Sequence, residues 1–264
     1  MNCRIRIIKI GGNVIDSPEM LQQFLSDFAS IEDARILVHG GGVMASRLQK
    51  ALGQEPVMME GRRITDEEAL KAVTMVYAGW CSKNIVALLQ SLGCSAAGLS
   101  GADADLIRAE KRPAGSLDYG FVGDVSPDGI NTGILRRFLN SGITPVICAI
   151  THDGCGQLLN TNADTIAYAL AAALASSGTE EISLTYCFEK EGVLYDRDDD
   201  SSLIPVLDYS MYCSLKEAGR IASGMIPKLD NAFAALRCGV SNVTVTHARN
   251  LLNGKGSRII LHKP

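Results

Sequence analysis

The sequence lacks the features of a nucleic-acid-binding or membrane-spanning protein. Its 264 residues carry 25 Lys and Arg against 29 Asp and Glu, so no excess of positive charge is present to attract a phosphate backbone. One uncharged stretch, residues 165–178, is alanine-rich and shorter than the ~20 strongly apolar residues that span a bilayer. No apolar leader precedes the first strand-like run, which predicts a cytoplasmic protein. We therefore expect neither nucleic acid nor a membrane as a partner.

The sequence also lacks the patterns of a metalloprotein. Its eight cysteines form no C-x-x-C pair, and no histidine stands at ligand spacing from them. Reduced thiols within a core are the expected state, because free cysteine is usually buried. The acidic run at residues 196–200 is expected to be a solvated loop, because carboxylates adjacent in sequence rarely converge on one ion. We predict no metal ligands in the chain.

The familiar phosphate-binding signatures are missing as well. The chain contains no G-x-x-x-x-G-K-[ST] and no G-x-G-x-x-G that opens a helix after a strand. The H-R-D and D-F-G elements of protein kinases are also absent. These absences exclude a P-loop NTPase, a dinucleotide-binding Rossmann protein and a protein kinase.

Strand-like and helical runs alternate along the chain, which indicates an α/β fold with a core large enough for one generous domain or two joined lobes. The predicted strands are residues 4–10, 35–38, a short one near 96, 144–150, 181–186, 242–246 and 258–261. The predicted helices are residues 17–30, 43–52, 66–92, 132–140, 163–176, 209–218 and 225–238. Residues 107–128 are expected to form hairpins, and a loop-rich change at 149–157 is the predicted boundary between two lobes. A capping box from Thr65 to Glu68 is expected to open the long helix.

Two glycine clusters follow strand-like runs: Lys9-Ile-Gly11-Gly12 and His39-Gly-Gly41-Gly42. Glycine lets a backbone approach a ligand closely, and the N–H groups at the start of a following helix attract anions. Each cluster alone is also consistent with a simple reversal of the chain. Lys9 is the sharper indication, because an ammonium group at the carboxyl end of a strand lies where ligands bind in open α/β sheets.

Two further segments combine polar groups with helix starts. Asn160, Asn162 and Asp164 precede an alanine-rich helix, either as a helix cap or as a substrate-binding group that orients lysines. Lys228 lies in the first turn of a helix, where the helix dipole disfavours a cation, so it is either a solvated side chain or a functional one.

Together these motifs resemble the acetylglutamate kinase branch of the amino acid kinase family. The matching segments are Lys9-Ile-Gly-Gly, His39-Gly-Gly-Gly, Gly61-Arg-Arg-Ile-Thr65, Leu159-Asn-Thr-Asn-Ala-Asp164 and Gly224-Met-Ile-Pro-Lys228, in the family's order and approximate spacing. The resemblance implies a three-layer α/β/α fold with an open, mainly parallel central sheet. It implies transfer of the γ-phosphoryl group of ATP to the side-chain carboxylate of N-acetylglutamate, in arginine biosynthesis. It also implies an acylglutamate-binding and dimerisation lobe at residues 1–150 and a nucleotide-binding lobe at residues 151–264.

The resemblance carries roles over to individual residues. Lys9 and Lys228 would stabilise the transferring phosphoryl group, Gly12 and Gly41 would donate N–H groups to it, and Asp164 would position both lysines. The implied substrate-binding residues are Gly41, Gly42, Arg63, Asn160 and Asn162, and the implied nucleotide-binding residues are Lys9, Gly11, Gly12, Gly192 and Lys228. Mg²⁺ would arrive on the nucleotide phosphates. No general base is needed, because a glutamate side chain is already ionised at pH 7.

Two departures from the family pattern leave questions open. The segment Leu184–Leu194 is longer than in the family and lacks its usual Asp, so the adenine contacts are not carried over to this segment. Ser257 stands where the family commonly has Thr. The chain starts on its first strand, which predicts a homodimer insensitive to arginine. Arg62 would suit the extra carboxylate of a succinyl group, so the substrate is either N-acetylglutamate or N-succinylglutamate. The alternatives are a kinase of carbamate or glutamate, or a non-catalytic nucleotide or amino-acid sensor on the same fold.

Overall fold

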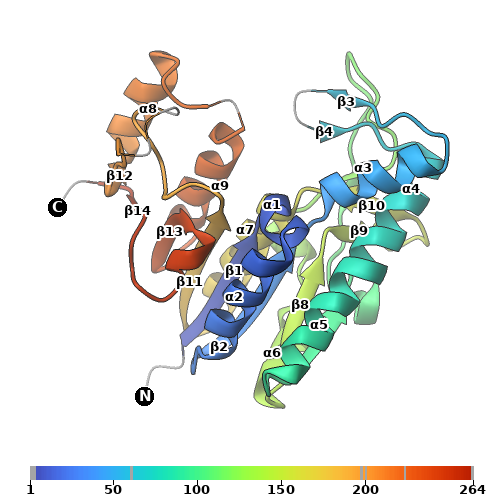
Figure 1. The fold of residues 1–264 in the computed structure, drawn as a ribbon, viewed down its shortest axis with the longest axis horizontal. Coiled ribbons are helices and arrows are strands. Elements are labelled where there is room, and N and C mark those ends of the chain that lie inside the picture. The colour runs from blue at the N-terminus through green and yellow to red at the C-terminus, as the bar shows by residue number, and fades with distance from the viewer. Residues whose placement is uncertain (1–3, 60–61, 197–198, 200, 223, 263–264) are drawn as a thin grey trace.

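A central sheet organises the computed structural model, which describes residues 4–59, 62–196, 199, 201–222 and 224–262. Within these residues the sheet has eight strands in the order β12-β14-β13-β11-β1-β2-β8-β5 (Figure 1). The strands are β1 (Arg4–Ile10), β2 (Ala34–His39), β5 (Ala96–Leu99), β8 (Thr144–Cys148), β11 (Glu181–Phe188), β12 (Val206–Asp208), β13 (Asn242–His247) and β14 (Ser257–Ile260). Every described pairing within this sheet is parallel except β13 with β14.

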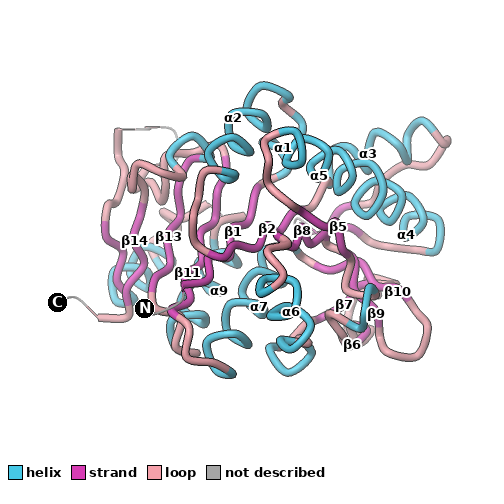
Figure 2. The backbone as a smooth tube through the Cα atoms, turned by 90° about the horizontal axis from the view of Figure 1, so that it is seen from below, coloured by secondary structure: helices cyan, strands magenta, loops and turns pink. Residues whose placement is uncertain are grey.

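Helices cover both faces of this sheet, as the view along the layers shows (Figure 2). One face carries α1 (Gly12–Asp16), α2 (Pro18–Ala29), α3 (Gly42–Ala51), α4 (Glu67–Thr74) and α5 (Ser82–Ser91). The other carries α6 (Thr132–Asn140), α7 (Ala163–Ser177) and α9 (Ile226–Arg237), while α8 (Tyr209–Glu217) follows edge strand β12. The expected three-layer α/β/α architecture with a mainly parallel sheet is therefore confirmed.

The core explains why the central strands read as continuous apolar runs. In β1, Ile5, Ile7, Ile8 and Ile10 are all buried, because helices shield both faces of a parallel sheet. Helix α7 is buried along most of its length, and its alanines allow close packing on the sheet. The uncharged stretch that begins at residue 165 therefore belongs to a core helix.

Smaller strands lie beside the main sheet. They are β6 (Glu110–Lys111), β7 (Val122–Asp124), β9 (Ile150–His152) and β10 (Leu158–Thr161) in a second sheet, and β3 (Met58–Met59) and β4 (Arg62–Arg63) in a hairpin. Of the hairpins predicted between residues 107 and 128, the antiparallel pair of β6 with β7 is present, whereas residues Pro127–Gly129 form a 3-10 turn. Strands β3, β4, β10 and β12 were not predicted; each has two to four residues, and polar or charged residues in or next to them mask any hydrophobic period.

Two boundary predictions were wrong. The strand expected over residues 144–150 is divided into β8 and β9, since the chain leaves the main sheet at Ala149. The long helix begins after Asp66, whose carboxylate accepts a hydrogen bond from the Ala69 N–H, so Thr65 is not its cap. Instead the Thr65 hydroxyl donates to the Arg63 carbonyl and accepts from Asn160. Gly61 and part of the acidic run at residues 196–200 lie outside the described residues.

The long helix is interrupted by a π-helical segment, Met75–Cys81, between α4 and α5. Among the described residues, Glu67–Ser91 is the one helix whose length and composition would allow it to cross a membrane. Its apolar face is buried against the domain, for example at Val73 and Ile85, which are fully buried. Burial of this kind is typical of a core helix in a folded domain.

Candidate active site

The two predicted glycine turns lie side by side. Strands β1 and β2 are adjacent and parallel, with Lys9 opposite Val38 and Ile10 opposite His39. Helix α1 starts at Gly12 and helix α3 at Gly42, so both helix starts face the same edge of the sheet. The first N–H groups of each helix have no partner within their own helix and are available to an anion.

Gly41 requires glycine for two reasons. Its φ of +151° is a conformation that L side chains rarely adopt. A Cβ atom at this position would also lie 3.0 Å from both Cys81 Sγ and the Tyr77 ring. These two side chains come from the π-helical segment, which therefore forms the floor beneath the second glycine turn.

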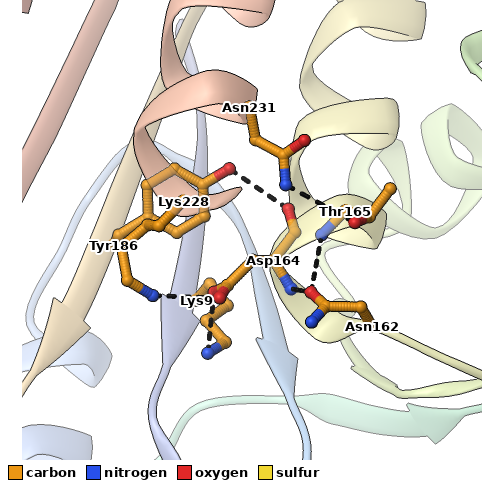
Figure 3. A network of polar contacts seen from close by, with 7 residues as sticks. All are labelled: Lys9, Asn162, Asp164, Thr165, Tyr186, Lys228 and Asn231. Atoms are coloured by element: carbon orange, nitrogen blue, oxygen red, sulfur yellow. Dashed lines mark hydrogen bonds and ion pairs between the residues drawn. The ribbon is translucent and has the colours of Figure 1, made fainter. Parts of the chain in front are cut away.

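Asp164, at the start of α7, joins Lys9 and Lys228 (Figure 3). Its Oδ1 lies 2.8 Å from Lys9 Nζ, and its Oδ2 lies 3.0 Å from Lys228 Nζ. The three side chains are only 16%, 12% and 10% exposed, respectively. Residues 9, 164 and 228 are far apart in sequence, so the fold alone brings this bridge together.

The contacts within this bridge shift the pKa values of Asp164 and Lys228. Burial alone would raise the pKa of Asp164, but the charges of Lys9 and Lys228 lower it well below its usual range. Burial and the nearby charge of Lys9 lower the pKa of Lys228, while Asp164 and Glu189 oppose that shift. A single carboxylate thus serves two ammonium groups, which leaves the centre with a net positive charge suited to a phosphoryl group.

Asn160 and Asn162 lie near this bridge with different partners. The Asn162 side chain caps α7, its Oδ1 accepting hydrogen bonds from the N–H groups of Asp164 and Thr165 at 2.8 and 3.1 Å. The Asn160 side chain projects from β10 and donates to Thr65 Oγ1 at 3.0 Å. The capping interpretation of Asn162 is therefore confirmed, and its amide nitrogen remains free of that cap.

Arg63 is buried and anchors the start of α3. One terminal nitrogen donates to the Gly42 carbonyl at 2.9 Å and to Ser46 Oγ at 2.7 Å, and the other donates to Gln49 Oε1. A guanidinium group has five N–H donors, so these contacts leave two for another acceptor. The geometry makes Arg63 a support for the second glycine turn as well as a candidate ligand for a carboxylate.

Two cavities meet at these residues. One, of about 580 Å³, is lined by Gly11, Gly12, Gly192, Arg220 and Lys228 among others. The second, of about 460 Å³, is lined by Lys9, Gly41, Arg63, Asn160, Asn162 and Asp164 among others. Gly12 and Gly42 line both. Every predicted site residue therefore lies at one cavity or at their junction.

The unusual segment after β11 forms part of the first cavity. Phe188 ends the strand and Glu189 to Leu194 follow it, and the predicted site residue Gly192 packs against Ser257. A Cβ atom at Gly192 would lie 2.6 Å from Ser257 Oγ, so this contact requires glycine. Ser257 Oγ itself accepts from the Val193 N–H and donates to the Ile204 carbonyl, which fixes the loop to β14.

Sequence reasoning missed several residues that line the cavities. Tyr77 faces the second cavity from the π-helical segment, and Arg112 lies there in an ion pair with Asp124. Phe188 faces the first cavity, and buried Tyr186 lies beside the bridge. An aromatic residue inside a core-like helix or strand carries no signal that separates it from ordinary packing.

Comparison with known proteins agrees with this geometry. The model of the amino acid kinase family matches residues 4–247. The chain belongs to the amino acid kinase family. It is 50% identical to the acetylglutamate kinase of Parabacteroides distasonis over 97% of this chain and 99% of that protein. It is 52% identical to the acetylglutamate kinase of Cytophaga hutchinsonii over 94% and 93% of the two chains.

A solved structure of another protein shares the fold. N-acetylglutamate synthase from Neisseria gonorrhoeae, in complex with coenzyme A and N-acetylglutamate, superposes with a TM-score of 0.83 at 23% identity. The match covers 100% of this chain and 61% of that one. At this identity the likeness shows a shared fold and nothing further.

Proposed function

We propose that the protein transfers the γ-phosphoryl group of ATP to the side-chain carboxylate of N-acetylglutamate, a step of arginine biosynthesis in the cytoplasm. The observation that carries the proposal is the Lys9–Asp164–Lys228 bridge at the junction of two cavities. Phosphoryl transfer needs the donor and acceptor to be aligned and positive charge where they meet, and it needs little covalent chemistry from the protein. The names of the close relatives add the acceptor.

The reaction follows from the arrangement. A carboxylate oxygen of the acylglutamate, held in the second cavity, forms a bond to the γ-phosphorus as the bond to the bridging oxygen of ATP breaks. The products are an acyl phosphate and ADP, and no proton is removed from the nucleophile. Lys9 and Lys228 neutralise charge on the equatorial oxygens, and N–H groups at Gly12 and Gly41 supplement them. The two ammonium groups repel each other, and Asp164 holds both at fixed positions.

Mg²⁺ belongs to the nucleotide in this proposal. Across the described residues, no group of three or more His, Cys, Asp or Glu side chains is placed to hold a metal ion. Carried in on the nucleotide phosphates, Mg²⁺ would supply positive charge in addition to that of Lys9 and Lys228.

The two lobes divide the substrates. Most of the first cavity's lining comes from residues 188–228, and most of the second comes from residues 9–149. This distribution supports a nucleotide-binding lobe at residues 151–264 and an acylglutamate-binding lobe at residues 1–150. Asn160 to Thr165 cross that division, because they line the second cavity.

The most specific part of the proposal is the identity of the N-acyl group on the glutamate substrate. Arg62 lines the same cavity as Arg63, so an N-succinylglutamate with a third carboxylate has a candidate partner there. N-acetylglutamate agrees with the names of the relatives and remains the proposed substrate. A carbamate or glutamate kinase and a non-catalytic sensor are not favoured by the same relatives.

The deciding experiment traps the acyl phosphate with hydroxylamine. Purified protein is incubated with Mg²⁺-ATP and either N-acetylglutamate or N-succinylglutamate, beside Lys9→Ala and Lys228→Ala variants. Lys216→Ala is the matched control, because its ammonium group pairs with Asp230 at the surface. We expect hydroxamate from the wild type and the control but not from the two variants. No product with either acylglutamate would refute the proposal.

A homodimer is also part of the proposal. Trp80 and Met75, on the π-helical segment, are 64% and 53% exposed, and edge strand β5 ends the sheet nearby. Exposed large apolar side chains on one helix are typical of a protein interface. Light scattering after gel filtration should give twice the 28.1 kDa chain mass for the wild type. Trp80→Asp should yield monomer, whereas Met211→Asp on α8 should not.

A further inference from the structure

The ammonium group of Lys228 lies against two aromatic rings. Its Nζ is 5.3 Å from the centroid of Tyr186 and 5.8 Å from that of Phe188. Both residues belong to β11, two positions apart, so they project from the same face of the strand. An ammonium group within about 6 Å of a ring centroid is attracted by the negative face of the ring. Lys228 is therefore bounded by Asp164 and by two rings.

The charge balance of the Lys9–Asp164–Lys228 bridge indicates that the two rings stabilise the ammonium group of Lys228. Lys9 and Lys228 share the single carboxylate of Asp164, so each ammonium group is incompletely neutralised. Besides Asp164, Glu189 attracts Lys228 electrostatically. A further carboxylate in direct contact with the lysines would repel the phosphoryl group. A ring face attracts a cation without carrying a net charge, so it stabilises Lys228 and leaves the positive charge of the centre intact.

Tyr186 is fixed by the same residue that holds the lysines. Its hydroxyl donates to the backbone carbonyl of Asp164 at 3.1 Å, as Figure 3 shows. Burial raises the pKa of Tyr186 well above its usual value, so the hydroxyl stays protonated and remains a donor. The ring is fully buried and cannot turn away from the lysine. Phe188 is nearly buried and lines the first cavity beside Lys228.

We propose that Tyr186 and Phe188 are positioning residues that hold the ammonium group of Lys228 in place for phosphoryl transfer. The inference rests on the proposed kinase function of the site. Both rings also contribute to the core, so the test must separate an electrostatic role from simple packing.

Fluorination at position 188 makes that separation. Each fluorine withdraws electron density from the ring face and weakens its attraction for a cation, while the ring keeps nearly the same shape. Phe188 is replaced by mono-, di- and trifluorophenylalanine, and kcat is measured with Mg²⁺-ATP and N-acetylglutamate. We expect kcat to fall stepwise with fluorine number, by roughly 2- to 30-fold in total, with KM for the acylglutamate unchanged. An equal kcat across the series would overturn the proposal.

A second measurement needs no substrate and therefore stands even if the kinase function fails. The titration of Lys228 is followed by carbon NMR of labelled lysine side chains, with the signal assigned by its loss in Lys228→Met. The charged groups facing Lys228 are Lys9, Asp164 and Glu189, and all are retained. Trifluorophenylalanine at 188 should shift the titration to lower pH by roughly 0.4 to 1.5 units, because the charged form loses a partner.

Position 186 offers a matched pair of variants for the same measurement. Tyr186→Leu removes the ring and should lower the titration midpoint of Lys228, whereas Tyr186→Phe keeps the ring and should change it much less. Unchanged midpoints in both the trifluorophenylalanine protein and Tyr186→Leu would refute the aromatic contact, whatever the enzyme's activity.

Discussion

Replacing Asp164 by Asn tests the central ion-pair bridge most directly. The substitution preserves shape but removes the one negative charge between Lys9 and Lys228, at side chains that are 16%, 12% and 10% exposed, respectively. At so little exposure, solvent screens the two ammonium groups weakly. Asn can still accept a hydrogen bond from one lysine but cannot neutralise either.

The expected loss of stability has a lower and an upper bound. Removing one partner of a buried ion pair costs about 3–5 kcal/mol, since an uncompensated charge is left behind. The protein can limit that loss by releasing the proton of Lys228, whose pKa is already lowered by burial and by Lys9. Full release at pH 7 costs at most about 5 kcal/mol, which is about 1.4 kcal/mol for each of some 3.5 units below an ordinary lysine pKa.

The sign of the pH dependence follows from that proton. In the variant, folded Lys228 would have a pKa further below that of the unfolded chain, so the unfolded state binds more protons between the two values. The stability of the variant should then rise with pH, and its deficit against the wild type should narrow between pH 7 and 9.5. Urea denaturation at several pH values measures this deficit.

The Asp164→Asn substitution should also lower kcat strongly. Losing the orientation of both lysines should lower kcat by roughly 10²- to 10⁴-fold, by analogy with removal of preorganised charge-stabilising groups. Asp33→Asn is the control, because Asp33 pairs with Arg6 in a partly exposed ion pair away from both cavities. A folded Asp164→Asn protein within tenfold of wild-type kcat, with a deficit independent of pH, would refute the reasoning.

Three further substitutions probe the backbone and the buried histidine. Ala104→Gly should raise the unfolding free energy by about 1 kcal/mol in urea titrations, because Ala104 has φ +53° at an exposed position; an unchanged value would contradict this strain. Gly41→Ala should lower kcat/KM by roughly 10²-fold, since its Cβ meets the Tyr77 ring, whereas Gly53→Ala, with φ +78° and open space, should retain activity. Burial lowers the pKa of His39 to about 4, so the free energy of unfolding should fall by up to about 3 kcal/mol as pH drops from 6.5 to 4. His39→Gln should flatten this part of the curve of unfolding free energy against pH.

The residues of the site were recognisable because their local context is unusual. Lys9 interrupts an apolar strand immediately before two glycines, and Lys228 places a cation in the first turn of a helix. Residues that depart from the local preference in this way can be recognised from the sequence before the fold is known. The long central strands and helices were predictable for the complementary reason, because several residues are enough to establish a hydrophobic period.

Other features had no local signal. Tyr77 lies in a segment that reads as ordinary α-helix, yet the π-helical turn directs it at Gly41. Strand β10 is only four residues long, and its polar residue Asn160 finds its partner in Thr65, 95 positions away. Pairing over such a distance depends on how the sheets stack, which no sequence window contains.

The sequence by itself determined the order of the longer strands and helices along the chain, the glycine turns and the three charged residues of the site, because each depends on a few neighbouring residues. Only the tertiary structure decided that Asp164 binds Lys9 and Lys228 at once, and that Tyr186 and Phe188 enclose one of those lysines. The physical reason is that a parallel sheet brings the carboxyl ends of distant strands to one edge. Ion pairs and cation–π contacts there act over a few ångströms of space, whatever the separation along the chain.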